Sequence, residues 1–141
     1  MMRRAAGPGL VAAALVLALA GSAGAQSVEC AGAQKPRQVA ELLFGRKIGE
    51  RVGVSEREFG RFVDREISPR FPDGLTVLDA AGEWNDTARK TIIHEPSKLV
   101  EIILPGHADD LDRLTRIAEA YKRQFQQQSV GIVTRAACVS F

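Results

Sequence analysis

The chain has 141 residues, of which 45% are hydrophobic and 26% are charged, and its formal net charge is +2 at pH 7. This length suits one domain with its own core, since a typical domain needs about 100–150 residues. The excess positive charge comes from Arg3 and Arg4, because residues 1–25 contain no acid and the remaining chain is neutral, so we expect no nucleic-acid-binding surface.

Residues 1–25 are typical of an export signal rather than of a folded segment. Two arginines precede an uncharged Leu-, Val- and Ala-rich run over residues 10–20, and Ala23-Gly24-Ala25 offers small residues for cleavage before Gln26. A retained N-terminal anchor is the less favoured alternative, because the run is shorter than the roughly 20 residues that span a bilayer. We therefore predict an exported protein, periplasmic or secreted, with no membrane segment after cleavage.

The mature chain is predicted to begin with an irregular lead-in over residues 26–36, followed by a single domain over residues 37–141. Residues 39–45 form an apolar run that favours a strand. Ser55 and Glu58 form a capping box that predicts the start of a helix. Its apolar face has helical spacing, and Pro69 cannot continue it; the face consists of Phe59, Phe62, Val63 and Ile67.

Extended segments follow over residues 75–84 and 90–104, joined by a predicted hairpin loop at residues 85–88. A second helix is predicted to begin at Asp109, Asp110 and Asp112 and to end near Lys122 and Arg123, as the helix dipole favours. Its expected apolar face consists of Leu111, Leu114, Ile117, Ala118, Tyr121 and Phe125. Residues 129–133 form the last predicted strand, which residues 137–141 continue.

This order predicts an α+β fold of the ferredoxin-like type (βαββαβ), in which two helices cover one face of an antiparallel sheet. Two separate strands within residues 90–104 would make the last strand parallel to the first. One long strand bent at Pro96 restores an antiparallel sheet, and proline within a strand is expected at a bulge or an edge. We therefore predict the single bent strand.

The two cysteines, Cys30 and Cys138, are predicted to form a disulfide. An even cysteine count in an exported protein favours a bond, and in this topology the last strand runs beside the first. Two unpaired thiols remain the alternative. Two distant cysteines offer too few ligands for a metal site, and the two histidines of the chain match no metal motif, so we expect no metal and no cofactor.

Glu41 and Glu101 are weak catalytic candidates. Strand alternation places both on the sheet face that the helices leave uncovered, together with Val39, Leu43, Leu99 and Ile103. Two close carboxylates raise the pKa of one of them, which suits acid–base catalysis. Solvation of each carboxylate, or pairing with Lys or Arg, is the favoured alternative.

Four further residues are weak binding candidates. Arg70 and Asp73 flank a turn, where they would either brace each other or contact a ligand. Trp84 at a hairpin would suit a partner contact if it is exposed. His94 lies near the strand bend, where a hydrogen-bonded surface histidine is the usual case.

Several segments together resemble a family of small exported bacterial proteins known as domain of unknown function family 3574. They are Arg70-Phe71-Pro72-Asp73-Gly74-Leu75-Thr76, Trp84, Glu95-Pro96-Ser97, Tyr121-Lys122 and Cys138-Val139-Ser140-Phe141. The resemblance implies export and a single domain, and it implies no activity or catalytic residue. Glu101 departs from it, since an aliphatic residue is implied at that position.

Two hypotheses about function follow from these patterns. The preferred one is a non-catalytic periplasmic binding or interaction module that forms a homodimer through the helix-free sheet face, with its ligand or protein partner unknown. The alternative is a small enzyme of the dimeric α/β-barrel type that uses Glu41 and Glu101 as an acid–base pair in a pocket on the same face.

Overall fold

The computed structural model describes residues 28–49, 51–86 and 90–141. The predicted export signal and residues 87–89 of the hairpin region lie outside these ranges. The chain forms β1 (Lys35–Gly45), β2 (Lys47–Ile48), β3 (Arg51–Val52), α1 (Glu56–Phe62), a π-helical turn η1 (Val63–Ile67), β4 (Thr76–Asp86), β5 (Thr91–Ile103), α2 (Asp110–Phe125) and β6 (Gly131–Val139).

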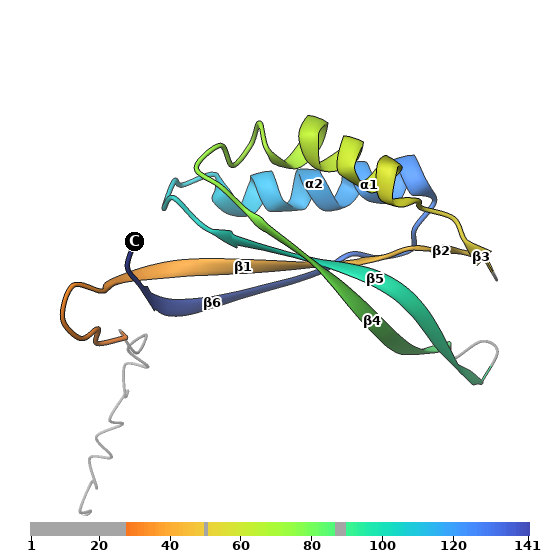
Figure 1. Cartoon of the computed structure of the whole chain (residues 1–141), viewed down its shortest axis with the longest axis horizontal. Coiled ribbons are helices and arrows are strands. Elements are labelled where there is room, and N and C mark those ends of the chain that lie inside the picture. Colours follow the sequence, from red (N-terminus) through yellow and green to blue (C-terminus); the bar gives the residue numbers. More distant parts are fainter. Residues whose placement is uncertain (1–27, 50, 87–89) are drawn as a thin grey trace, which may run out of the picture.

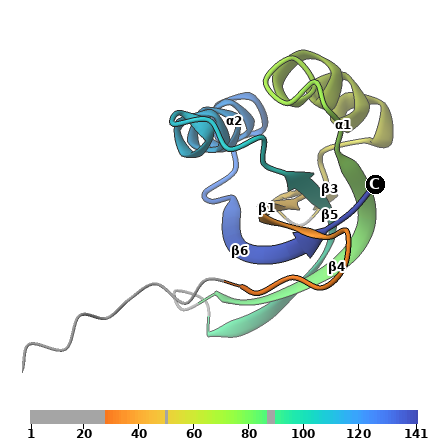
Figure 2. The same cartoon turned by 90° about the vertical axis from the view of Figure 1, so that its left-hand side faces the viewer.

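The four long strands form one antiparallel sheet in the order β4-β5-β1-β6, and both helices cover the same face of it (Figure 2). This is the predicted ferredoxin-like α+β arrangement. The short strands β2 and β3 form a separate two-stranded sheet. The strands twist strongly, so the β1–β6 pair and the β4–β5 hairpin extend beyond the helices in opposite directions (Figure 1).

Strand β5 is continuous through Pro96, as predicted. It has 13 residues, and Pro96 lies opposite Ala81 of the edge strand β4. On its other side, β5 pairs with β1 only as far as Ser97, which lies opposite Gly45 at the end of β1, so Pro96 has no register partner in β1. The Pro96 carbonyl then accepts a hydrogen bond from the Arg46 N–H at 3.1 Å. The proline therefore sits where the central ladder ends, which limits the cost of its missing N–H.

Two strand boundaries differ from the prediction. β1 begins at Lys35, within the expected lead-in, and β6 runs without interruption over Gly131–Val139. Nine consecutive register pairs join these two strands, from Lys35 opposite Val139 to Leu43 opposite Gly131. Mutual pairing thus extends both strands through residues whose local strand preference is weak. Asn85 and Asp86, expected in a hairpin loop, belong to β4.

The core lies between the sheet and the helices and contains a cluster of five aromatic rings. The predicted apolar faces of both helices are buried, with Val63 only partly so. They share one core with residues of β1 and β5, namely Leu42, Phe44, Val100 and Ile102. Leu111 is an exception, since it is 62% exposed. Its side chain lines an open groove between the first turn of α2 and the sheet, where Gln38, Thr134 and Ala136 lie opposite, instead of packing in the core.

The predicted capping box at the start of α1 is present. The Ser55 hydroxyl accepts a hydrogen bond from the Glu58 N–H at 3.3 Å, and the Glu58 carboxylate accepts one from the Ser55 N–H at 2.9 Å. We expect Ser55→Ala to lower the free energy of unfolding by about 1 kcal/mol. Urea titration would measure this loss, with Ser129→Ala, at an exposed position outside the helices, as the control. Equal stability of the two variants would contradict the assigned role of the cap.

Candidate functional site

The helix-free face of the sheet is built from three rows of side chains that the strand register places side by side. The first row is apolar and consists of Leu78, Leu99, Leu43 and Gly131. The second consists of Thr76, Glu101, Glu41 and Val133, and the third of Ile103, Val39 and Arg135. A row of aliphatic residues thus borders a row with two adjacent carboxylates.

Glu41 and Glu101 are direct register partners, as strand alternation predicts. Arg135 of β6 bridges them, because its Nη2 lies 2.9 Å from Glu41 Oε1 and 3.0 Å from Glu101 Oε2. All three side chains keep some solvent exposure: 24% for Glu41, 38% for Glu101 and 48% for Arg135. The carboxylates are therefore a charge-paired group on an open surface, and a catalytic role for them stays a prediction.

Sequence analysis did not identify Arg135, because the predicted last strand was interrupted at residues 134–136. Strand alternation could have identified it, since a continuous strand over residues 131–139 places Arg135 on the same face as Val133.

Val39 is less exposed than its position on the helix-free face suggests. It lies on the expected face but is 3% exposed, since its register partners Ile103 and Arg135 stand on either side of it. The apolar surface of this face comes instead from Leu43, Leu78 and Val133, which are 44%, 47% and 43% exposed.

The predicted disulfide joins Cys30 to Cys138, whose Cα atoms lie 5.5 Å apart. Cys138 is opposite Pro36 in the β1–β6 pair, and Cys30 lies in the segment that leads into β1. The bond therefore fastens this segment to the end of the last strand.

The four weak binding candidates do not converge on one site. Arg70 donates hydrogen bonds to the carbonyl and carboxylate of Glu66, at 2.6 Å and 2.9 Å. Its ion-pair partner is therefore Glu66, four residues earlier, and not Asp73. Trp84 is 42% exposed. His94 lies 2.9 Å from Glu83 across the hairpin, on the opposite face from Trp84.

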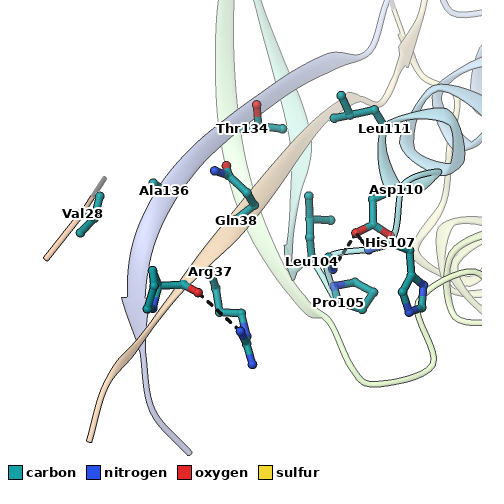
Figure 3. A pocket seen from close by; sticks show the side chains of 12 residues that line it. Val28, Arg37, Gln38, Leu104, Pro105, His107, Asp110, Leu111, Thr134 and Ala136 are labelled. Atoms are coloured by element: carbon teal, nitrogen blue, oxygen red, sulfur yellow. Dashed lines mark hydrogen bonds between the residues drawn. The ribbon is translucent and has the colours of Figure 1, made fainter. Parts of the chain in front are cut away.

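Two pockets lie on either side of the loop that connects β5 to α2. The first is a groove of about 680 Å³ between this loop, the first turn of α2 and the ends of β1 and β6. Figure 3 shows Leu104, His107 and Asp110 grouped on the α2 side of it, across from Val28 and Ala136. The second pocket has about 580 Å³, and it is lined by Asp73, Glu101, Arg37 and Phe141 among others. His107 lines both pockets.

The β5–α2 loop also brings together three potential metal ligands. His107, Asp109 and Asp110 each offer a ligand atom, and these atoms lie within 4.8 Å of one another. Sequence analysis expected no metal, because the two histidines of the chain match no metal motif, and it interpreted Asp109 and Asp110 only as a helix start. The position of the three residues at a helix start could have indicated the cluster, because the turn at the start of a helix brings side chains that are two and three residues apart close together.

A buried lysine links α1 to the sheet. Lys98 is 5% exposed, and its Nζ donates to Glu56 at 2.6 Å and to Asp79. The hydrogen bonds that Lys98 donates to Asp79 and Glu56 raise its pKa above the usual value. A lysine nucleophile needs a lowered pKa, so this arrangement favours a structural role.

Comparison with known proteins gives a family and a fold. A phage SAM lyase in complex with S-methyl-5′-thioadenosine has a TM-score of 0.58 and 14% identity, covering 83% of this chain and 97% of the lyase. The same lyase in its apo state gives 0.55 and 14%, covering 82% and 97%. CutA from Synechococcus elongatus gives 0.46 and 7%, covering 75% and 81%. At these identities the similarity to the lyase concerns the fold alone.

No curated protein sequence matches the chain. The family model for proteins of unknown function DUF3574 matches residues 39–141, which is most of the chain and includes every segment on which the sequence resemblance rests. The chain therefore belongs to the DUF3574 family.

Proposed function

We propose that the protein is an exported, non-catalytic interaction module that forms a homodimer through the helix-free face of its sheet. The bridge from Arg135 to Glu41 and Glu101 carries this proposal. Two unpaired carboxylates would oppose burial in an interface, because an uncompensated charge is costly to desolvate. Charge pairing by Arg135 reduces that cost and leaves the adjacent apolar row free to make contact.

The occupant of this face is a second copy of the chain. Arg37 occupies the next position along β1 on the same face, so two guanidinium groups and two carboxylates lie on neighbouring rows and their formal charges cancel. This balanced group does not make two copies of the face repel each other, and a two-fold axis lets the same patch serve both partners. Exposed aliphatic side chains in such a patch usually mark a contact.

The enzyme alternative receives less support from the geometry. It needs a pocket that contains both carboxylates. Of the two pockets described above, the first contains neither glutamate, and the second contains Glu101 without Glu41.

Export is supported by the residue pattern before Gln26 and by the disulfide, since such bonds persist in oxidising compartments. Among the described residues, no helix has the length and apolar character needed to cross a membrane.

Light scattering coupled to size-exclusion chromatography tests the dimer. We expect the mature protein to elute with twice the mass of one chain. Leu43→Arg introduces a charge into the apolar row and is expected to weaken dimerisation by at least about tenfold. Leu111→Arg is the matched control, because Leu111 is also exposed but lies on the helical side. A wild-type monomer at high protein concentration would refute the dimer, and so would a dimer that survives Leu43→Arg and is lost in Leu111→Arg.

A further inference from the structure

We propose that His107, Asp109 and Asp110 bind a divalent transition-metal ion, and that Zn²⁺ is the ion their donor set fits best. This proposal does not depend on the dimer. The three ligand atoms lie within 4.8 Å of one another. Small adjustments of the two exposed side chains, His107 and Asp109, bring such atoms to the bond lengths of about 2.0–2.2 Å that zinc requires.

Asp110 provides the independent observation that points to a ligand. This residue is 5% exposed, and its Oδ2 accepts hydrogen bonds from the N–H groups of Gly106 and His107, both at 2.9 Å. Gly106 has φ +92°, a conformation that glycine adopts without strain, and this turn brings the two N–H groups to the carboxylate. Asp110 is thus held in place before any ligand binds.

The second oxygen of the same carboxylate lacks a partner. Asp110 Oδ1 is buried and makes no hydrogen bond to any part of the described chain. Buried carboxylate oxygens are nearly always satisfied, because losing hydration without compensation is costly. A metal ion beside Oδ1 would supply the missing interaction, and Figure 3 shows the carboxylate directly beside His107.

The charge around this site favours a cation. Asp109, Asp110 and Asp112 lie within the first turn of α2, whose N-terminus contributes only about half a positive charge. Arg113 pairs with Asp109, with its Nε 2.9 Å from Oδ2, which leaves the other oxygen of Asp109 for a metal. Arg113 and Arg37, which lines both pockets from β1, place two guanidinium groups beside these three carboxylates, so the acidic groups still outnumber these basic ones.

The donor set selects the class of ion. Imidazole nitrogen with two carboxylate oxygens is typical of Zn²⁺ and other first-row divalent ions, whereas Ca²⁺ and Mg²⁺ prefer oxygen ligands alone. Three protein ligands leave a fourth position of a tetrahedral ion for water or another group. His107 lines both pockets, so that position would be reached from either of them.

Isothermal titration of the tag-free mature protein with ZnCl₂ tests this proposal. We expect one ion per chain, and His107→Gln should weaken binding by about tenfold or more. His94→Gln is the matched control, because His94 is the other of the two histidines of the chain and its side chain is 70% exposed. Asp110→Asn should also weaken binding, while its amide oxygen still accepts the two loop N–H groups; circular dichroism checks that this variant folds.

Three results would overturn the site. The first is the absence of zinc binding by the wild type. The second is equal affinity of the wild type and His107→Gln, which would assign the zinc to another place. The third is Ca²⁺ binding as tight as Zn²⁺ binding and unaffected by His107→Gln, which would reduce the feature to an acidic cluster. In the first case an ordered water is the partner of Asp110 Oδ1.

Discussion

Replacing both Cys30 and Cys138 with alanine is expected to lower the free energy of unfolding by about 4–5 kcal/mol, because the disulfide closes a very long loop. The two cysteines are 108 residues apart in the sequence. Without the bond the unfolded chain regains the entropy that loop closure removes, while most native contacts remain. Guanidinium titration of the mature wild type and of the double variant, both under non-reducing conditions, measures the difference.

Two controls accompany this experiment. The wild type with a reductant should lose as much stability as the double variant, and thiol counting on the denatured, non-reduced wild type should find no free thiol. Equal midpoints for the wild type and the double variant, or two free thiols per chain, would show that the bond does not form.

Phe62→Ala is expected to lower the free energy of unfolding by about 3–5 kcal/mol. The side chain is fully buried at the centre of the aromatic cluster, and its ring lies 5.1 Å from Tyr121, 5.9 Å from Phe125 and 6.0 Å from Phe44, measured between centroids. Truncation removes contacts to both helices and to the sheet and leaves a cavity that these rigid rings cannot fill. Thermal and urea unfolding measure the loss.

Phe141→Ala is the matched control for this substitution, because the Phe141 side chain is fully exposed. Its stability should stay within about 0.5 kcal/mol of the wild type. Similar losses in the two variants would mean that the assignment of the buried face of α1 is wrong.

Local sequence patterns predicted those parts of the fold that depend on the spacing of apolar residues and on residues that start or end helices and strands. Ser55 and Glu58 located the start of α1, and the antiparallel geometry required residues 90–104 to form one strand through Pro96. The same alternation placed Glu41 and Glu101 on one face, because neither strand is shifted in register. The helix start and the alternation within each strand are encoded within a few residues, whereas the single strand followed from the topology of the whole sheet.

Features that depend on distant pairing could not be predicted in this way. The strand extensions at Lys35 and at residues 134–136 exist because β1 and β6 pair with each other, so the position of Arg135 was missed. The exposure of Leu111 likewise depends on polar and small residues contributed by β1 and β6. Lys98 is buried because Glu56 and Asp79, from a helix and another strand, surround its ammonium group.

Glu101 shows how one long-range contact explains a local irregularity. A charged residue in a central strand departs from the aliphatic residue that the family resemblance implies. The structure places the guanidinium of Arg135 3.0 Å from it, and a second carboxylate shares the same cation. A sequence pattern confined to β5 contains no information about this partner.

The position of β1 in the sheet has a consequence for the order in which the chain can fold. β1 is central, but both of its neighbours, β5 and β6, come from the second half of the sequence. During synthesis β1 therefore has no partner in this sheet until β5 has emerged, and its pairing with β6 waits for residues 131–139. Such non-local pairing is slow, because the chain must close large loops before it gains contacts. Late completion of the sheet is compatible with the export proposed above, because a chain whose central strand is still unpaired remains open for longer.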